Sequence, residues 1–248
     1  MLSVIIIAKN EAANIGDCIQ SVAWADEIIV VDSGSTDRTV AIAREMGAQV
    51  YLHADWPGFG PQKNRALGYA SFEWIFSIDA DERVTPELRA ELEQSMRDST
   101  ADGYYCPRLS QFCGTFIHHC GWYPDYVLRL FKRAAGQFSD SLVHESVLLT
   151  GKTAKLHSPL LHYSYLTTDD VERKVAHYST AAAQQMFEGG KRSSLAGAVL
   201  SGGWAFIRTY VIRLGVLDGA AGWRIAHMNS RTTYLKYRKL AALHSAAR

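Results

Sequence analysis

Acidic side chains follow the apolar runs in the first hundred residues of this chain. Glu11 comes just after the first run, Asp32 ends the second, and Asp79 and Asp81 follow the fourth. Two aspartates two positions apart after a strand can hold Mg²⁺ or Mn²⁺, because these hard cations prefer oxygen ligands and keep positions open for phosphate oxygens. The pattern therefore predicts a site at which a divalent cation neutralises a diphosphate.

The apolar runs predict the strands that position these carboxylates. Each run is short and rich in β-branched residues, as in strands buried within a parallel sheet. Helical spacing and capping residues between the runs predict alternating helices, which is the α/β pattern. The predicted strands are residues 2–8, 27–32, 49–53 and 72–78. Four helices are predicted between and after them. The first follows a cap at Asn10 or Asn14, the second begins at Ser35 or Thr36, the third begins at about Gln62, and the fourth begins at Pro86 after the cap Thr85.

Two further stretches differ from this alternation. Residues 53–61 contain two prolines and two glycines, so the sequence predicts a loop there. Beyond residue 100, short strands at 104–109, at 126–132 and around Val147 predict a mixed extension, and a helix is expected over 169–187.

The carboxylates should meet at one edge of the sheet. In an open parallel sheet, the loops that leave the carboxyl ends of the strands form the crevice that binds ligand. Each acid also has a local explanation, since Asp32 could serve a turn and Asp79 a capped turn. A shared site explains all of them at once, and we favour it.

At this point the chain resembles family 2 inverting glycosyltransferases with the GT-A fold. The resemblance covers about the first 100 residues and lies in four successive motifs: Ala8-Lys9-Asn10-Glu11, Val30-Val31-Asp32-Ser33-Gly34-Ser35-Thr36-Asp37, Lys63-Asn64-Arg65-Ala66-Leu67 and Ile78-Asp79-Ala80-Asp81-Glu82. Later motifs are similar to lipopolysaccharide core β-1,4-glucosyltransferases that modify the inner-core heptose: Gly121-Trp122-Tyr123-Pro124-Asp125, Leu128-Arg129-Leu130-Phe131-Lys132-Arg133, Val143-His144-Glu145-Ser146 and Leu161-His162-Tyr163.

The resemblance implies a GT-A type, mostly parallel sheet flanked by helices, and a nucleotide diphosphate sugar donor, UDP-glucose in the narrower branch. It assigns the donor to the residues in the first four motifs: Ala8, Glu11, Asp32, Lys63, Arg65 and Asp79. The implied metal, Mg²⁺ or Mn²⁺, would be held by Asp81, Asp79 and His162. Lys63 and Arg65 suit phosphate near a helix start, with a pair of surface cations as the alternative.

The resemblance also implies the acceptor half of the reaction. Inversion needs one direct displacement in which a base removes the proton of the acceptor hydroxyl. Glu145 occupies the place of that base, and His144 is the alternative base or an orienting partner. Asp125 and Arg129 are expected to line the pocket for a lipopolysaccharide core acceptor. The chain lacks the Gln-x-x-Arg-Trp signature of processive synthases, so we expect transfer of a single sugar.

Charge divides the chain into two parts. Residues 1–190 hold 16 basic and 24 acidic side chains, whereas residues 191–248 hold ten basic side chains and only Asp218 as an acid. We expect a catalytic domain over 1–190, with its donor half at about 1–100 and its acceptor half at about 101–190, and a basic helical extension over 191–248. Basic residues among aromatic ones suit contact with anionic lipid head groups or another polyanion, and a solvated helix pair is the alternative.

The apolar segments of the sequence indicate where in the cell the protein is expected. The start of the chain has no basic flank and long apolar core of a signal peptide, which favours a cytoplasmic protein, with peripheral contact at the inner face of the membrane. Arg208 and Arg213 interrupt the late apolar stretch 195–217, so no unbroken span of ~20 apolar residues is expected. No nucleic-acid partner is expected.

Two other functions compete with sugar transfer. A sugar nucleotidyltransferase would also use nucleotide, metal and aspartates, but it usually carries a glycine-rich loop after the first strand, and here the first glycine is Gly16. A glycolipid-binding protein without catalysis is the second alternative, against which the retained Asp79, Asp81 and Glu145 argue. A dinucleotide-dependent oxidoreductase is remote because no Gly-x-Gly-x-x-Gly follows the first strand.

Overall fold

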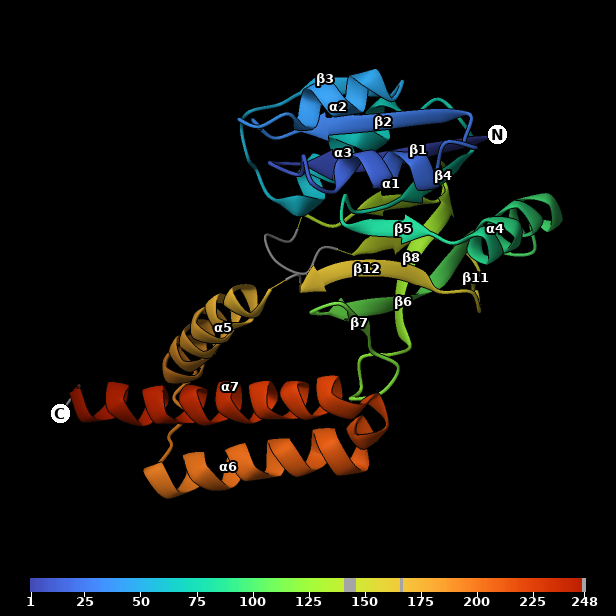
Figure 1. The fold of residues 1–248 in the computed structure, drawn as a ribbon. Coiled ribbons are helices and arrows are strands. Elements are labelled where there is room, and N and C mark those ends of the chain that lie inside the picture. The colour runs from blue at the N-terminus through green and yellow to red at the C-terminus, as the bar shows by residue number, and fades with distance from the viewer. Residues whose placement is uncertain (141–145, 166, 247–248) are drawn as a thin grey trace. The chain divides into compact units, whose positions relative to one another are not determined.

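The computed structural model describes residues 1–140, 146–165 and 167–246. The chain forms two compact units, and each is described by itself (Figure 1). The first comprises Met1–Arg108 and Asp125–His162, and the second comprises Leu109–Pro124 and Tyr163–Arg248.

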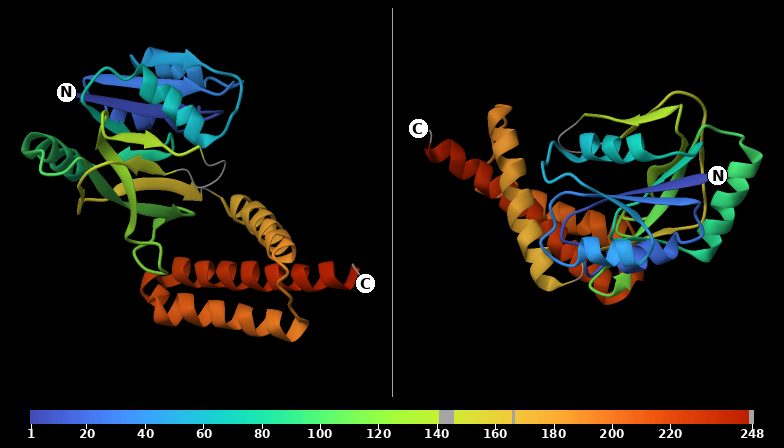
Figure 2. Two further views of the ribbon diagram at one scale, coloured as in Figure 1. Left: turned by 180° about the vertical axis from the view of Figure 1, so that it is seen from behind. Right: turned by 90° about the horizontal axis from the view of Figure 1, so that it is seen from above.

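A parallel group of strands forms the start of the sheet in the first unit. Its spatial order is β3-β2-β1-β4, and each neighbouring pair is parallel (Figure 2). The bounds are β1 Leu2–Ala8, β2 Glu27–Asp32, β3 Gln49–Leu52 and β4 Trp74–Ser77. These strands confirm the alternating pattern predicted for the first hundred residues.

The same sheet continues with antiparallel strands beyond β4, in the order β8-β6-β12-β5. Their bounds are β8 Asp125–Lys132, β6 Gly103–Phe112, β12 Leu160–Tyr165 and β5 Glu82–Val84. The short strands β7 (Thr115–Phe116) and β11 (Thr153–Lys155) pair with β6, and β9 (Gly136–Phe138) pairs with β10 (Val147–Leu149) in a separate hairpin.

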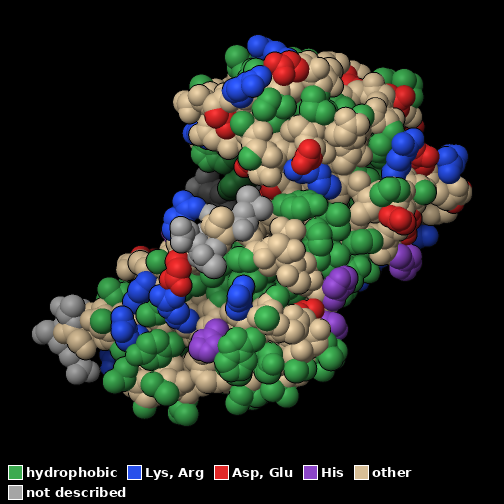
Figure 3. All heavy atoms as spheres, in the orientation of Figure 1, with side chains coloured by type: hydrophobic (Ala, Val, Ile, Leu, Met, Phe, Trp, Pro, Cys, Tyr) green, Lys and Arg blue, Asp and Glu red, His purple; other side chains and the backbone are tan. Residues whose placement is uncertain are grey.

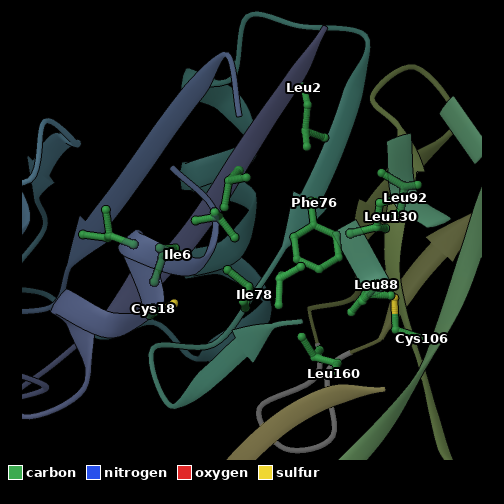
Figure 4. Close-up of a cluster of buried hydrophobic side chains, with 14 of the residues drawn as sticks. Leu2, Ile6, Cys18, Phe76, Ile78, Leu88, Leu92, Cys106, Leu130 and Leu160 are labelled. Carbon is green, nitrogen blue, oxygen red and sulfur yellow. The ribbon is translucent and has the colours of Figure 1, made fainter. Parts of the chain in front are cut away.

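Helices cover both faces of the parallel strands because side chains alternate along each strand. On one face, Leu2, Val4 and Ile6 of β1 pack in one cluster with α1 (Ile15–Ser21) and α4 (Pro86–Asp98). Figure 4 shows part of this cluster. On the other face, Ile5 packs with Ala66 of α3 (Phe59–Tyr69). The remaining helix of this region is α2 (Thr39–Glu45).

Two helix starts differ from the sequence expectation. α2 begins at Thr39 rather than at Ser35 or Thr36, because the Asp32 carboxylate accepts hydrogen bonds from Gly34 and Ser35 and holds this segment in a turn. α3 begins at Phe59, so the loop predicted to extend through residue 61 is too long. Proline in a first helical turn is tolerated, since its missing N–H has no intrahelical partner there.

The second unit contains the last helices. They are α5 (Thr168–Glu188), α6 (Leu195–Ile207), the π-helical turn η1 (Arg208–Ile212), the 3-10 turn η2 (Gly215–Asp218) and α7 (Gly219–Ala246). The predicted basic extension is therefore helical. The continuous helix Leu195–Ile212 is long and apolar enough, by length and composition alone, to cross a membrane, and it contains Arg208 and ends just before Arg213.

Candidate active site

The carboxyl ends of β1, β2 and β4 lie at one edge of the sheet. Ala8 at the end of β1 pairs with Asp32 at the end of β2. Just beyond β4, the Ile78 amide donates to the Ile5 carbonyl of β1 at 3.1 Å. The loops that carry Glu11, Asp32 and Asp79 therefore leave three adjacent parallel strands at the same edge, as a shared site requires.

The loops after β1 and β2 are tied to each other. Asp32 is buried, and its Oδ1 accepts from the Gly34 and Ser35 amides at 3.0 and 2.9 Å. The Asn10 side chain accepts from the Thr36 amide at 2.8 Å. Asp32 thus stabilises a turn, as its local explanation predicted. It does so within a frame of two hydrogen-bonded loops at the sheet edge.

Glu11 lies in the same frame. Its amide donates to Thr39 Oγ1 at 2.8 Å, and its carboxylate accepts from Asn14 Nδ2 at 2.8 Å. Burial raises the pKa of Glu11 above its usual value, and the negative charges of Asp81 and Asp37 add to this effect. A cation bound near these carboxylates would offset the smaller part of the rise, which comes from the charges of Asp81 and Asp37.

Asp79 is held between two cations. Its Oδ1 lies 3.0 Å from Lys63 Nζ of α3, and its Oδ2 lies 2.5 Å from Arg129 Nη2 of β8. Burial alone would raise the pKa of Asp79, but the positive charges of Arg129 and Lys63 outweigh it and hold the pKa well below its usual range. Both oxygens of Asp79 are therefore engaged within the protein.

Glu82 completes this network. Its side chain is fully buried, 2.6 Å from Arg129 Nη2 and 3.7 Å from Arg108 Nη1, and it also accepts from the Asp79 amide at 3.0 Å. Burial raises the pKa of Glu82, although the charge of Arg129 opposes the change. The Arg129 guanidinium thus joins the turn after β4 to the middle of the sheet.

Asp81 has a different environment. Its Oδ2 lies 3.3 Å from His162 Nε2 on β12, next to β5 in the sheet. Among the described residues, no group of three or more His, Cys, Asp or Glu side chains is arranged to hold a metal. Two donors nevertheless suit Mg²⁺ or Mn²⁺, since such cations in phosphate sites take few protein ligands and fill their other positions with substrate oxygens and water.

Two expected ligand residues are paired elsewhere. Arg65 forms a two-point contact with Asp55 and a 2.9 Å hydrogen bond to Gln62, so the structure places it in a surface ion pair. Asp125 bonds Arg108, its cross-strand neighbour, at 3.0 and 2.6 Å. Neither side chain lines the cavity described next.

A cavity of about 460 Å³ opens beside the charge network. Arg129, Lys63 and Asp79 contribute to its wall, and the Arg129 Nε proton is buried without a hydrogen-bond partner among the described residues. The other lining residues are Tyr105, Arg108, Tyr126, Val127, Leu128, Phe138, Ser146 and Val147. A cavity wall with three cationic side chains suits an anionic or strongly polar ligand.

Arg108 and Glu82 belong to this network but were not among the candidate residues. Glu82 ends the Ile78-Asp79-Ala80-Asp81-Glu82 motif, so its acidic neighbours were a signal. Arg108 had no local signal, because only the antiparallel pairing of β6 with β8 places it opposite Asp125. His144 and Glu145 lie outside the described residues.

The comparisons with known proteins decide the family. A model of glycosyl transferase family 2 matches residues 3–142, which is more than half of the chain. The chain belongs to glycosyl transferase family 2. It is 35% identical over 226 residues to the lipopolysaccharide core biosynthesis glycosyltransferase LpsC of Rhizobium meliloti, covering 84% of this chain and 80% of LpsC. An uncharacterized glycosyltransferase of Rickettsia felis is 31% identical over 255 residues, covering 96% of this chain and 89% of its own length.

A solved structure supports the fold assignment. The crystal structure of S. aureus TarS residues 1–349 superposes with a TM-score of 0.51 at 15% identity, covering 100% of this chain and 92% of the TarS chain in that structure. This family 2 enzyme thus has the expected GT-A type sheet, flanked by helices and followed by a helical extension.

Proposed function

We propose that this family 2 glycosyltransferase moves a single sugar, glucose from UDP-glucose, to an inner-core heptose of a lipopolysaccharide acceptor, with inversion at the anomeric carbon. The observation that carries the proposal is the meeting of Glu11, Asp32 and the Asp79 turn at one sheet edge. The likeness to LpsC, whose name describes lipopolysaccharide core biosynthesis, supports the class of acceptor. Family membership favours sugar transfer over the nucleotidyltransferase and the glycolipid-binding alternatives.

The donor would bind at the frame formed by the loops after β1 and β2. Ala8, Glu11 and Asp32 are proposed to contact the nucleoside, with Asp79 beside the ribose. A crystal structure of TarS in complex with UDP, which superposes with a TM-score of 0.50 at 15% identity, makes UDP the first nucleotide to test. Lys63 is the better proposed phosphate partner, because it lines the cavity, whereas Arg65 is paired with Asp55 and does not line it.

Asp81 and His162 are the proposed ligands of Mg²⁺ or Mn²⁺. Asp79 is proposed to act through Lys63 and Arg129, the two cationic side chains that it binds. When bound, a divalent cation neutralises charge that develops on the leaving diphosphate. The carboxylate of Glu11, whose pKa is raised in part by the nearby charge of Asp81, adds negative charge that favours such a cation. The orphaned Arg129 N–H in the cavity wall supports an acceptor that carries polar oxygens, because a buried donor needs a partner.

In the displacement itself, an acceptor hydroxyl oxygen bonds to the anomeric carbon while the bond from that carbon to the diphosphate oxygen breaks. The bonding electrons leave with the nucleoside diphosphate, and Glu145 is the proposed base that takes the hydroxyl proton, with His144 as the alternative. Ser146, the next residue in the chain, lines the cavity, which supports a base from this segment. A cytoplasmic location agrees with a donor of this kind.

One experiment tests the reaction. The purified protein is incubated with Mg²⁺ or Mn²⁺ and a panel of nucleotide sugars, with and without truncated lipopolysaccharide, and donor consumption and the product linkage are measured. Asp81→Ala should abolish turnover and keep the fold, whereas Glu145→Gln should bind donor and fail to transfer. Leu52→Ser, an exposed change at the end of β3, is the control. Transfer that persists in Glu145→Gln would move the base role elsewhere, and no consumption of any donor would refute the proposed reaction.

A further inference from the structure

The helix α6 and the turn η1 carry their large apolar side chains outward. We call the following four residues the outward face, because each is exposed and helical spacing places it opposite the buried side of the helix: Leu200, Trp204, Ile207 and Val211. A helix of a globular protein normally turns its apolar stripe toward the core. Here Leu200 and Trp204 are 75% and 57% exposed, so the arrangement is reversed.

The opposite side of this helix consists of small residues packed on α7. Ala198, Gly202 and Thr209 are buried. A Cβ at Gly202 would lie 3.1 Å from the Tyr234 Cβ, and Thr209 Oγ1 accepts from Asn229 Nδ2 at 3.1 Å. Small residues let the two helices approach closely, and the outward face is left without a partner within the described residues of this unit.

Charge distinguishes the segment that carries this face. Lys191 and Arg192 precede α6, and Arg208 and Arg213 lie at its far end, all four exposed. Residues 189–217 contain no acidic side chain, and the carboxylate of Asp218 is 5% exposed and bonded to His119. In Figure 3, hydrophobic side chains line the lower rim of this unit, where α6 lies. An apolar surface between exposed cations complements an anionic lipid surface.

We propose that the outward face lies in the surface of a membrane containing anionic lipids, with α6 and α7 parallel to the membrane plane. A membrane-spanning α6 would draw α7, which packs along it, into the hydrocarbon with its own cations, among them Arg224 and Arg231. Charged side chains at membrane depth are costly, so the pair lies on the surface although α6 with η1 has the length to cross.

A second copy of the chain fits this face less well. Two copies paired through the same patch would bring identical cations such as Arg208 and Arg213 together. The segment offers no acidic residue to pair with them, whereas anionic lipid headgroups supply the opposite charge. The outward face is therefore assigned to lipid.

Vesicle flotation of the full chain tests the assignment without donor or acceptor, so its failure would leave the proposed sugar transfer intact. The vesicles contain either phosphatidylglycerol and phosphatidylcholine or phosphatidylcholine alone. We expect binding to the anionic vesicles that weakens with salt. L200S/W204S should lower the partition coefficient at least about tenfold, because two large apolar side chains are lost. L52S removes a 60% exposed leucine of the first unit and should change nothing.

A second pair of variants tests the charge contribution independently. R192Q and R208Q should each lower binding to anionic vesicles about fivefold and leave binding to phosphatidylcholine unchanged. Unaltered binding by L200S/W204S, or no vesicle binding by the natural sequence, would overturn the proposal. So would light scattering that shows a dimer broken by L200S/W204S in the absence of vesicle binding, since the face would then belong to a second copy.

The depth of Trp204 tests the orientation. Lipids with a quencher near the headgroup should quench tryptophan fluorescence more than lipids with a quencher at the bilayer centre. W204F should remove most of this difference while it keeps vesicle binding. Stronger quenching from the bilayer centre would refute the parallel placement.

Discussion

Replacing Arg129 by methionine should destabilise the protein through the two carboxylates that it joins. Arg129 Nη2 lies 2.5 Å from Asp79 and 2.6 Å from Glu82. Removing one partner of a buried ion pair typically costs about 3–5 kcal/mol. Asp79 keeps Lys63 at 3.0 Å and is about a third exposed, whereas the fully buried Glu82 keeps only Arg108 at 3.7 Å. We therefore expect a loss at the lower end, about 3 kcal/mol, chiefly from Glu82.

The pH dependence has a definite sign. The pKa of Glu82 is raised in the folded protein, so the folded state keeps a proton that the unfolded state releases as pH rises above the ordinary glutamate value. Stability from this group is therefore present at low pH and falls as pH rises through the raised pKa. Losing Arg129 raises that pKa further, so the defect should be larger at pH 8 than at pH 5.5.

Urea unfolding followed by circular dichroism at both pH values measures these effects. R129M/E82Q should recover about 1–2 kcal/mol relative to R129M, because it removes the unpaired buried charge. R38M breaks the exposed pair of Arg38 with Glu45 and should change stability by less than about 0.5 kcal/mol. If R129M unfolds at the same urea concentration as the natural protein, or if E82Q rescues nothing, the charge-network reasoning is wrong.

Three further outcomes are expected. Asp32→Ala removes the acceptor for two loop amides and should weaken UDP binding at least about tenfold in calorimetry, with unchanged circular dichroism. Asp102→Asn should flatten the acid limb of stability below about pH 4, because hydrogen bonds from Lys152 and Lys132 lower the pKa of Asp102 and its contribution is lost as pH falls through that pKa. Leu92→Ala in the core should cost about 2–5 kcal/mol in urea unfolding and leave UDP affinity unchanged.

The parallel half of the fold could be predicted because its signals are local. The runs at 2–8 and 27–32 match β1 and β2 residue for residue. Thr85 and Pro86 marked the start of α4, where the Thr85 side chain accepts from the Leu88 amide at 3.1 Å. Short stretches of sequence are enough to predict both buried strands and helix caps.

Features that depend on tertiary contacts could not be predicted from sequence patterns. The start of α2 was predicted too early, because helix propensity does not reveal that Asp32 would bind the amides of Gly34 and Ser35. Burial of Lys63 beneath Asp79 was equally invisible, since a lysine in a helical motif resembles a surface cation. The pairing of Arg108 with Asp125 needs the β6–β8 register, which no local pattern encodes.

The two aspartates of the turn after β4 differ in what surrounds them, and this difference bears on the proposed reaction. Asp79 is neutralised by Lys63 and Arg129, so a cation at its carboxylate would first have to displace protein charges. Asp81 lies 3.3 Å from His162 and near the acidic Glu11. In the proposed reaction, the metal-holding task therefore falls on Asp81, while Asp79 fixes the turn. Substituting Asp79 should accordingly reduce stability as well as turnover, whereas substituting Asp81 should reduce turnover alone.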